Sequence, residues 1–239
     1  MDIHDIHNIS TTCTRTEFVG TAVLDTIGLV ISGVDDSLLQ QMNVGTKYHC
    51  LGLFSSRTGA AGQITAIDDA VKATNTEVLS IELPRDTKGW GGHGNYIVLG
   101  GNDVSDVRHA ISLALELTNK NAGEVYISES GHLEFAFSAS AGPAIHKAFG
   151  TPLGEAFGFM AGSPAAIGLV MADNAVKSAA VSITKYMTPD IGTSHSEVII
   201  AISGDASAVK AAVLEGRQTG LELLIGMGTY PEIPGTPYL

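Results

Sequence analysis

Hydrophobic and polar residues alternate along several short stretches of the chain, as expected of strands with one buried face. The clearest stretch is Leu133–Ser138, in which every second residue from Leu133 is a large apolar one. Elsewhere apolar residues recur three and four positions apart, as at Ile64, Ile67 and Val71. That spacing predicts a helix with one apolar face. The pattern therefore predicts short strands mixed with amphipathic helices.

Both halves of the chain predict the same order of elements: two strands, a short helix, a strand, an amphipathic helix, two strands and a long helix. The first half gives Phe18–Leu24, Leu29–Ser32, Ser37–Met42, Leu51–Phe54, Ile64–Val71, Val78–Leu83 and Tyr96–Leu99. The second gives Glu124–Ser128, Leu133–Ser138, Ala144–Phe149, Phe157–Ala161, a helix with Leu169, Ala172 and Val176 on its apolar face, Ser182–Met187 and Val198–Ile202. Asp103 and Asp205 are the predicted N-caps of the two long helices.

The common order reflects a duplication within the sequence. A shift of 105 residues places Ile67–Lys72 on Ala172–Lys177, and a later shift of 102 places Asp103 on Asp205. Matches of Asp and Lys at a constant offset are harder to obtain by chance than matches of Ala. The chain is therefore predicted to be a tandem repeat.

Each repeat is predicted to be a small α+β domain, an antiparallel sheet flanked by helices. We expect a flexible tail at residues 1–14, a first domain at 15–120, and a second domain at 121–239 that ends in a short C-terminal tail. Two arrangements fit such a repeat. The domains form one pseudo-symmetric monomer, or three chains close into a ring of six similar wedges, in line with the closed symmetry of most homo-oligomers.

Composition favours the ring and argues against two classes of partner. The 239 residues include 13 Lys and Arg against 25 Asp and Glu, so the net charge is −12. Binding to nucleic acid or to an anionic membrane needs a basic surface. Charged residues make up only 16% of the chain, against about 25% in an average domain. That shortage suggests that other copies of the chain cover part of the surface.

No known catalytic or cofactor motif is present in its working context. Gly89–Gly94 has the spacing G-x-G-x-x-G, but a predicted strand follows it, whereas a dinucleotide site needs a helix there. The histidines are scattered, and two cysteines are too few for a disulfide scaffold or a four-thiolate metal site. The sequence predicts no enzyme, no cofactor and no metal. A hydrolase built on His93 or His195 is the weaker alternative.

Several segments together resemble the bacterial microcompartment (BMC) shell domain: Glu155–Phe159, Ala165–Ala166, Asp173–Lys177, Gly204–Asp205 and Val209–Val213. The extra strand and helix before each domain are similar to the circularly permuted, trimer-forming branch of that family. The segment from Pro84 to Gly94 is similar to its propanediol-utilization members. The resemblance covers about residues 17–225.

This resemblance implies a cytoplasmic shell protein, a homotrimer with pseudo-hexagonal symmetry that tiles with hexameric shell proteins. Pores in the tile would pass a small diol or polyol such as 1,2-propanediol or glycerol. Contacts with encapsulated enzymes are left open by the sequence. A soluble trimeric sensor that binds a small molecule between the repeats is the alternative function.

A polyol that crosses a pore must regain from the wall the hydrogen bonds it made with water. Residues 33–37 form an acidic turn on tight backbone, and its repeat counterpart at 138–142 is uncharged. Similar permuted shell proteins place an acidic turn at a pore, although helix capping by Asp36 or Ser37 explains these residues equally well. The pore candidates are Asp35, Asp36, Ala139, Ser140 and, more weakly, Glu82.

The segment from Arg85 to Asn95 is a long glycine-rich loop, either a gate at the three-fold centre or a plain connection. The loop residues singled out, with those of the shorter second loop, are Trp90, Gly91, Gly92, His93, Gly94, Ser194 and His195. Lys72 and Lys177 occupy the same place in the two repeats. The resemblance implies that they lie at tile edges, and a solvated helix face is the alternative.

Overall fold

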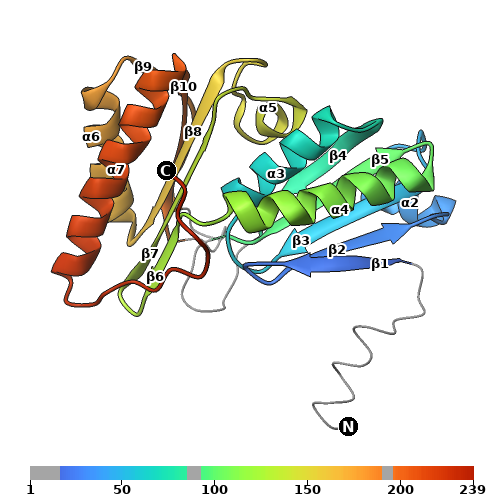
Figure 1. The fold of residues 1–239 in the computed structure, drawn as a ribbon, viewed down its shortest axis with the longest axis horizontal. Coiled ribbons are helices and arrows are strands. Elements are labelled where there is room, and N and C mark those ends of the chain that lie inside the picture. Colours follow the sequence, from blue (N-terminus) through green and yellow to red (C-terminus); the bar gives the residue numbers. More distant parts are fainter. Residues whose placement is uncertain (1–16, 85–92, 190–195) are drawn as a thin grey trace, which may run out of the picture.

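Each half of the chain folds into a five-stranded antiparallel sheet in the computed structural model, which describes residues 17–84, 93–189 and 196–239 (Figure 1). The first sheet has the order β1-β2-β3-β5-β4, formed by β1 (Phe18–Ala22), β2 (Thr26–Ile31), β3 (Cys50–Ser56), β5 (Asn95–Gly101) and β4 (Thr76–Glu82). The second has the order β6-β7-β8-β10-β9, formed by β6 (Val125–Ser128), β7 (Gly131–Ser138), β8 (Ala156–Ser163), β10 (Val198–Gly204) and β9 (Val181–Met187). The two orders correspond strand by strand, so the duplication is also a structural repeat.

Helices lie on both faces of each sheet, the two longer ones of each domain on one face and the short one on the other (Figure 1). The first domain carries α2 (Asp36–Met42), α3 (Ala61–Lys72) and α4 (Val104–Asn121). The second carries α5 (Pro143–Phe149), α6 (Ala165–Ser178) and α7 (Ala206–Gly226). Each predicted strand and helix is present, with ends within a few residues of the expected ones. The α+β fold class is therefore confirmed.

The apolar face predicted for α6 is partly wrong. Leu169 is exposed, whereas Ile167, Met171 and Ala175 are buried. These three lie four residues apart, on one side of the helix that faces the sheet and α7. Leu169 comes two residues after Ile167, which is about 200° around a helix of 3.6 residues per turn. It therefore lies on the opposite side.

The two predicted N-caps also differ. The Asp205 carboxylate accepts a hydrogen bond from the backbone N–H of Ser207 at 2.9 Å, as a capping residue should. Asp103 occupies the N-cap position of α4, but its side chain makes no capping hydrogen bond. The predicted position is confirmed in both repeats, and the predicted side-chain contact only in the second.

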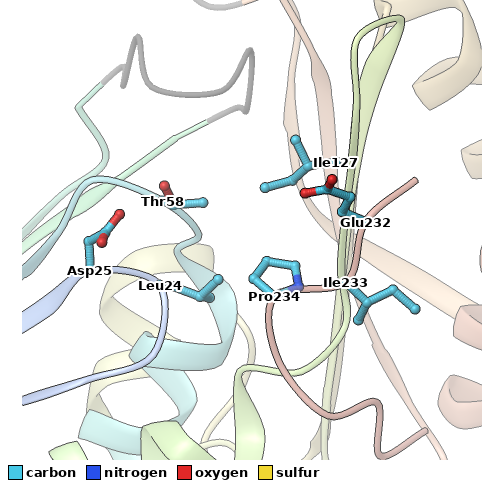
Figure 2. Close-up of a pocket in the computed structure, with 7 residues that line it drawn as sticks. All are labelled: Leu24, Asp25, Thr58, Ile127, Glu232, Ile233 and Pro234. Carbon is cyan, nitrogen blue, oxygen red and sulfur yellow. The ribbon is translucent and has the colours of Figure 1, made fainter. Parts of the chain in front are cut away.

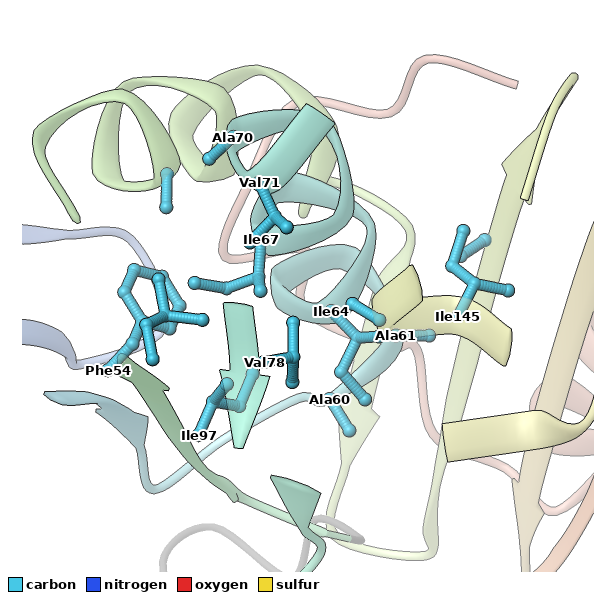
Figure 3. Packing of buried hydrophobic residues seen from close by; sticks show 14 of the residues in the cluster. Phe54, Ala60, Ala61, Ile64, Ile67, Ala70, Val71, Val78, Ile97 and Ile145 are labelled. Atoms are coloured by element: carbon cyan, nitrogen blue, oxygen red, sulfur yellow. The ribbon is translucent and has the colours of Figure 1, made fainter. Parts of the chain in front are cut away.

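The two domains share one hydrophobic core, built around α3. Ile64 and Ile67 of this helix belong to the same buried cluster as Phe54 of the first sheet and Ile145 of α5 in the second domain. Figure 3 shows α3 between Phe54 on one side and Ile145 on the other. Ten of the twelve α3 residues are buried for this reason. The domains are thus packed side by side rather than joined by the linker alone.

The residues after α7 return to the junction between the domains (Figure 1). Glu232 pairs with Ile127 of β6 through two backbone hydrogen bonds of 2.7 and 2.9 Å. Further along, the N–H groups of Tyr238 and Leu239 donate to the Glu124 carboxylate at 2.6 and 2.8 Å. Burial pushes the pKa of Glu124 upward, but these hydrogen bonds outweigh it and hold the pKa below its usual range. The C-terminal segment is therefore bound to the second domain.

We expect Glu124→Ala to release this segment and to lower the free energy of unfolding by about 2 kcal/mol, because the carboxylate is buried and its donors lose their acceptor. Hydrogen exchange should quicken at the amides of Tyr238 and Leu239. Glu129→Ala, in the exposed turn after β6, is the matched control and should change neither quantity. Unchanged exchange at Tyr238 and Leu239 in Glu124→Ala would contradict the assignment.

Candidate functional site

The strand register sorts the candidate residues to two opposite ends of the sheets. At one end, here called the turn end, β2 leads into α2 and β7 leads into α5. At the other, here called the loop end, β4 leads into β5 and β9 into β10. Asp35, Asp36, Ala139 and Ser140 lie at the turn end, since they follow β2 and β7. Glu82 pairs with Tyr96 at the loop end, so it does not join the other pore candidates.

The acidic turn is a helix cap with a second, exposed carboxylate. Asp35 precedes α2 and accepts hydrogen bonds from both the backbone N–H (2.9 Å) and the hydroxyl of Ser37. These bonds hold the pKa of the Asp35 carboxyl below its usual range. The cap is thus Asp35, one residue earlier than the earliest predicted one, because α2 already begins at Asp36. The Asp36 carboxylate is exposed, 3.6 Å from the His49 imidazole.

The uncharged counterpart of this turn, at 138–142, lies where the two domains meet. Asp68 of α3 is fully buried, and its carboxylate accepts hydrogen bonds from Gly142, Ala144 and Ile145, at 2.7, 2.9 and 3.1 Å. These three N–H groups belong to the first turn of α5, which has no side-chain cap of its own. A carboxylate of the first domain therefore caps a helix of the second.

The two pore candidates in this uncharged turn differ in what they can offer a polar molecule. Ala139 and Ser140 are both exposed. Ser140 has a side-chain hydroxyl, which can donate and accept hydrogen bonds, whereas Ala139 has only a methyl group. Of the two, only Ser140 therefore has a side chain suited to a polar pore wall.

The two equivalent lysines have different surroundings. Lys72 lies 2.8 Å from Asp68 and donates to the backbone oxygen of Ser140 at 2.7 Å, so it is engaged in the contact between the domains. Lys177 is 70% exposed and pairs with Asp173 one turn earlier on α6. Of the two, Lys177 therefore remains the candidate for a contact with another chain.

A second carboxylate also joins the two domains by hydrogen bonds, near the N-terminus of α3. Glu134 of β7 is buried and accepts hydrogen bonds from the N–H groups of Ala60 and Ala61 at 2.9 and 2.8 Å. Burial raises the pKa of Glu134 to about 7. The sequence analysis missed both bridging carboxylates. A signal was present, because α3 begins without a Ser, Thr, Asp or Asn at its N-cap, and Glu134 interrupts an apolar strand.

His93, singled out as part of a gate, is buried at the loop end. Its Nδ1 contacts the Oε1 of Glu197, which lies in the second domain just before β10. His132 of β7 is fully buried beside them, with Nε2 4.0 Å from Oε2 of Glu197, and burial lowers its pKa. Gly94 donates its N–H to the Pro84 carbonyl at 2.8 Å. These residues join the two loops to each other.

The other loop candidates, Trp90, Gly91, Gly92, Ser194 and His195, lie outside the described residues. Over residues 17–84, 93–189 and 196–239, no group of three or more His, Cys, Asp and Glu side chains is arranged to hold a metal ion.

A cavity of about 370 Å³ lies between the domains at the loop end (Figure 2). Leu24, Asp25 and Thr58 line it from the first domain, and Ile127 from β6. The C-terminal segment supplies the rest, Glu232, Ile233 and Pro234. Carboxylates and a hydroxyl beside apolar side chains suit a small molecule with both hydroxyl and methyl groups. The sequence analysis missed this cavity because it treated the C-terminal segment as a tail.

Known proteins are similar to this chain over both of its domains. The BMC domain model matches residues 50–130 and 156–232. The bacterial microcompartment shell protein PduB of Citrobacter freundii is 50% identical over 228 residues, which cover 95% of this chain and 84% of the relative. The chain belongs to the BMC-domain family of microcompartment shell proteins.

Two solved BMC structures match nearly the whole chain. A trimeric microcompartment shell protein PduB superposes with a TM-score of 0.88 at 45% identity, covering 93% of this chain and 99% of that one. EtuB from Clostridium kluyveri superposes with a TM-score of 0.90 at 46% identity, covering 95% and 100%. The tandem architecture predicted from the sequence is confirmed.

Membership of the BMC family also settles two broader points. Proteins of this family have a structural rather than a catalytic role. This chain is a component of a bacterial microcompartment. Among the described helices, none combines the length and the apolar character needed to cross a membrane.

Proposed function

We propose that three copies of this shell protein close into a pseudo-hexagonal tile whose pores pass small uncharged diols such as 1,2-propanediol or glycerol. The observation that supports the tile is the contact between the two domains through α3 and α5. One chain already contains two similar domains side by side, so three chains supply the six wedges of a closed ring. The tile would pack beside hexameric shell proteins, with Lys177 at its edge.

The native mass of the purified protein tests the tile. We expect an assembly with three times the 24.8 kDa of one chain. A stable species of 24.8 kDa would contradict it, because two domains alone cannot close a hexagon. The sensor considered as an alternative finds no support in the curated relatives reported above, which are named as shell proteins.

The diol pore rests on the chemistry of the turn end. Asp35 and Asp36 present carboxylates to solvent on the first domain, and Ser140 presents a hydroxyl on the second. Carboxylates and hydroxyls accept hydrogen bonds from a diol, and the negative charge repels anions. A pore edged by these groups would favour neutral polyols over anionic metabolites.

We expect Asp35→Asn/Asp36→Asn to raise the entry of a small anion into assembled shells about threefold to tenfold, because two like charges near the path are removed. Entry of 1,2-propanediol should change less than about twofold, since amides still accept hydrogen bonds. Glu116→Gln/Glu215→Gln removes two exposed helix charges elsewhere and is the matched control. Equal anion entry in both variants would argue against a pore at the turn end.

A further inference from the structure

The C-terminal segment, residues 227–239, is attached to one domain and faces the other. Its hydrogen bonds to the described residues all go to the second domain, at α7, Ser130, Ile127, Glu124, Phe137 and Arg217. Three of its residues nevertheless line the cavity between the domains: Glu232, Ile233 and Pro234. Figure 2 shows them opposite Leu24, Asp25 and Thr58 of the first domain. One wall of the cavity is therefore held by the second domain alone.

This wall is a single layer of chain. Ile233 lines the cavity and is still 44% exposed, so solvent reaches the segment from its outer side. Glu232 is bound by its backbone pairing with Ile127, and Tyr238 by its N–H bond to Glu124. Between them, residues 233–237 make no hydrogen bond with any described residue. The wall is thus fastened at its two ends and not along its length.

The far end of the segment is fastened by one buried side chain, that of Glu124. Its carboxylate accepts the N–H groups of Tyr238 and Leu239 at 2.6 and 2.8 Å. The Tyr126 hydroxyl and the Arg217 guanidinium also donate to this carboxylate, at 2.8 and 3.1 Å, and so fix its position. Leu239 packs beside the second-domain core. Loss of the Glu124 carboxylate would therefore free residues 238–239.

The near end of the segment has a glycine that suits a hinge. Gly228 follows α7 with a φ of +92°, a conformation that residues with a Cβ rarely adopt. No atom lies within 4 Å of the place where a Cβ would stand on Gly226 or Gly228. Rotation of the backbone at Gly228 therefore meets open space, and the segment beyond it can swing away from the cavity.

We propose that the C-terminal segment is a strap that opens and closes the cavity between the domains, hinged at Gly228 and latched by Glu124. Opening breaks the backbone pairing at Glu232 and the bonds of residues 238–239. It leaves the helix caps made by Asp68 and Glu134 in place, because the segment takes no part in them. The domains therefore stay together while the cavity widens. The strap is a device of one chain and does not rest on the proposed tile.

Hydrogen exchange of the unmodified protein tests whether the strap opens by itself. We expect the amides of Glu232, Tyr238 and Leu239 to have protection factors at least tenfold lower than those of Ala144 and Ile145, which are bonded at the domain junction. The reason is that strap opening exposes the first three amides without separating the domains. Equal protection of the two sets would overturn the proposal, since the segment would then open only together with the junction.

A cysteine in the cavity tests whether strap opening gives access to it. Thr58 is buried and lines the cavity, so Thr58→Cys is placed in a chain that also carries Cys13→Ala and Cys50→Ala. We expect Glu124→Ala to raise the rate of maleimide labelling at position 58 about tenfold or more. Glu129→Ala, in the exposed turn after β6, is the matched control and should leave the rate unchanged. Equal labelling rates in these two variants would overturn the latch.

A cross-link that holds the strap closed provides the converse test and keeps Glu124 intact. Ile127 and Glu232 are direct partners in an antiparallel bridge, in which Cα atoms lie about 5.5 Å apart. That distance is within the range of a disulfide, so Ile127→Cys/Glu232→Cys can be oxidised to lock the strap. Labelling at position 58, followed by peptide mapping, should then fall at least tenfold, and prior reduction should restore it. Unchanged labelling in the oxidised protein would mean that the cavity is reached without strap movement, which would overturn the proposal.

Discussion

Replacing Asp68 by alanine is expected to lower the free energy of unfolding by about 3–5 kcal/mol, the usual cost of removing one partner from a buried charged contact. The Asp68 carboxylate is fully buried, where it accepts three backbone N–H groups of α5 and pairs with Lys72. Alanine would leave those three N–H groups without their acceptor at the junction of the domains, and Lys72 would lose its buried partner. Urea denaturation at one fixed protein concentration measures the change, since assembly also contributes to stability.

Asp69→Ala is the matched control for this experiment. Asp69 is the next residue of α3 and lies 3.3 Å from the same Lys72 ammonium, but its side chain is 42% exposed. Exposed ion pairs contribute about 0–1 kcal/mol, so we expect a change within that range. Similar losses in the two variants would mean that Asp68 acts through its charge on Lys72 alone. The capping of α5 would then contribute little to the junction.

The repeat explains how much of this fold could be predicted from sequence. Alternation and helical spacing are local, and they placed each strand and helix of both domains. The surroundings of a residue in the folded protein, by contrast, depend on segments that are distant in the sequence. Lys72 and Lys177 match in sequence, yet one is engaged between the domains and the other is exposed. Among the described residues, α5 packs on α3 beside Lys72, but α2 does not pack on α6 beside Lys177, so only Lys72 is covered.

The contacts that join the domains escaped prediction for a related reason. Asp68 and Glu134 each cap a helix more than seventy residues away, and no spacing rule connects residues at that separation. Glu82 illustrates the opposite error. It was grouped with Asp35 because both residues are acidic and lie near the end of a strand. In the structure Glu82 lies at the loop end of the sheet, where β4 ends, whereas Asp35 lies at the turn end, after β2. The charge of a residue does not show at which end of the sheet that residue lies.

The contribution of Glu134 to the stability of this protein is expected to fall as the pH rises from about 4.5 to about 7. Burial raises the pKa of Glu134 to about 7 in the folded chain from an ordinary value of 4.5. Between these values the folded protein holds a proton that the unfolded chain has released. Stability from this residue is therefore complete below about pH 4.5 and lost above about pH 7, a total of about 3 kcal/mol.

Glu134→Gln isolates this contribution. The amide does not titrate, and its oxygen can still accept from the two N–H groups at the start of α3. We expect the difference in unfolding free energy between wild type and variant to change by about 3 kcal/mol between pH 4 and pH 8, as measured by urea denaturation across that range. His132 acts in the opposite direction, because its lowered pKa makes stability rise with pH up to about 6.5. That contribution is common to both proteins and cancels in the difference.

Parallel pH profiles of the two proteins would contradict this account. They would mean that Glu134 has the same pKa folded and unfolded, so that the amides of Ala60 and Ala61 fully offset the cost of burying its charge. Glu134 would then be an ionised carboxylate at neutral pH. With unequal profiles, Glu134 takes up a proton in mild acid and caps α3 in its neutral form. The two caps also differ in their partners, because Asp68 accepts three N–H groups and lies beside the Lys72 ammonium, whereas Glu134 accepts two.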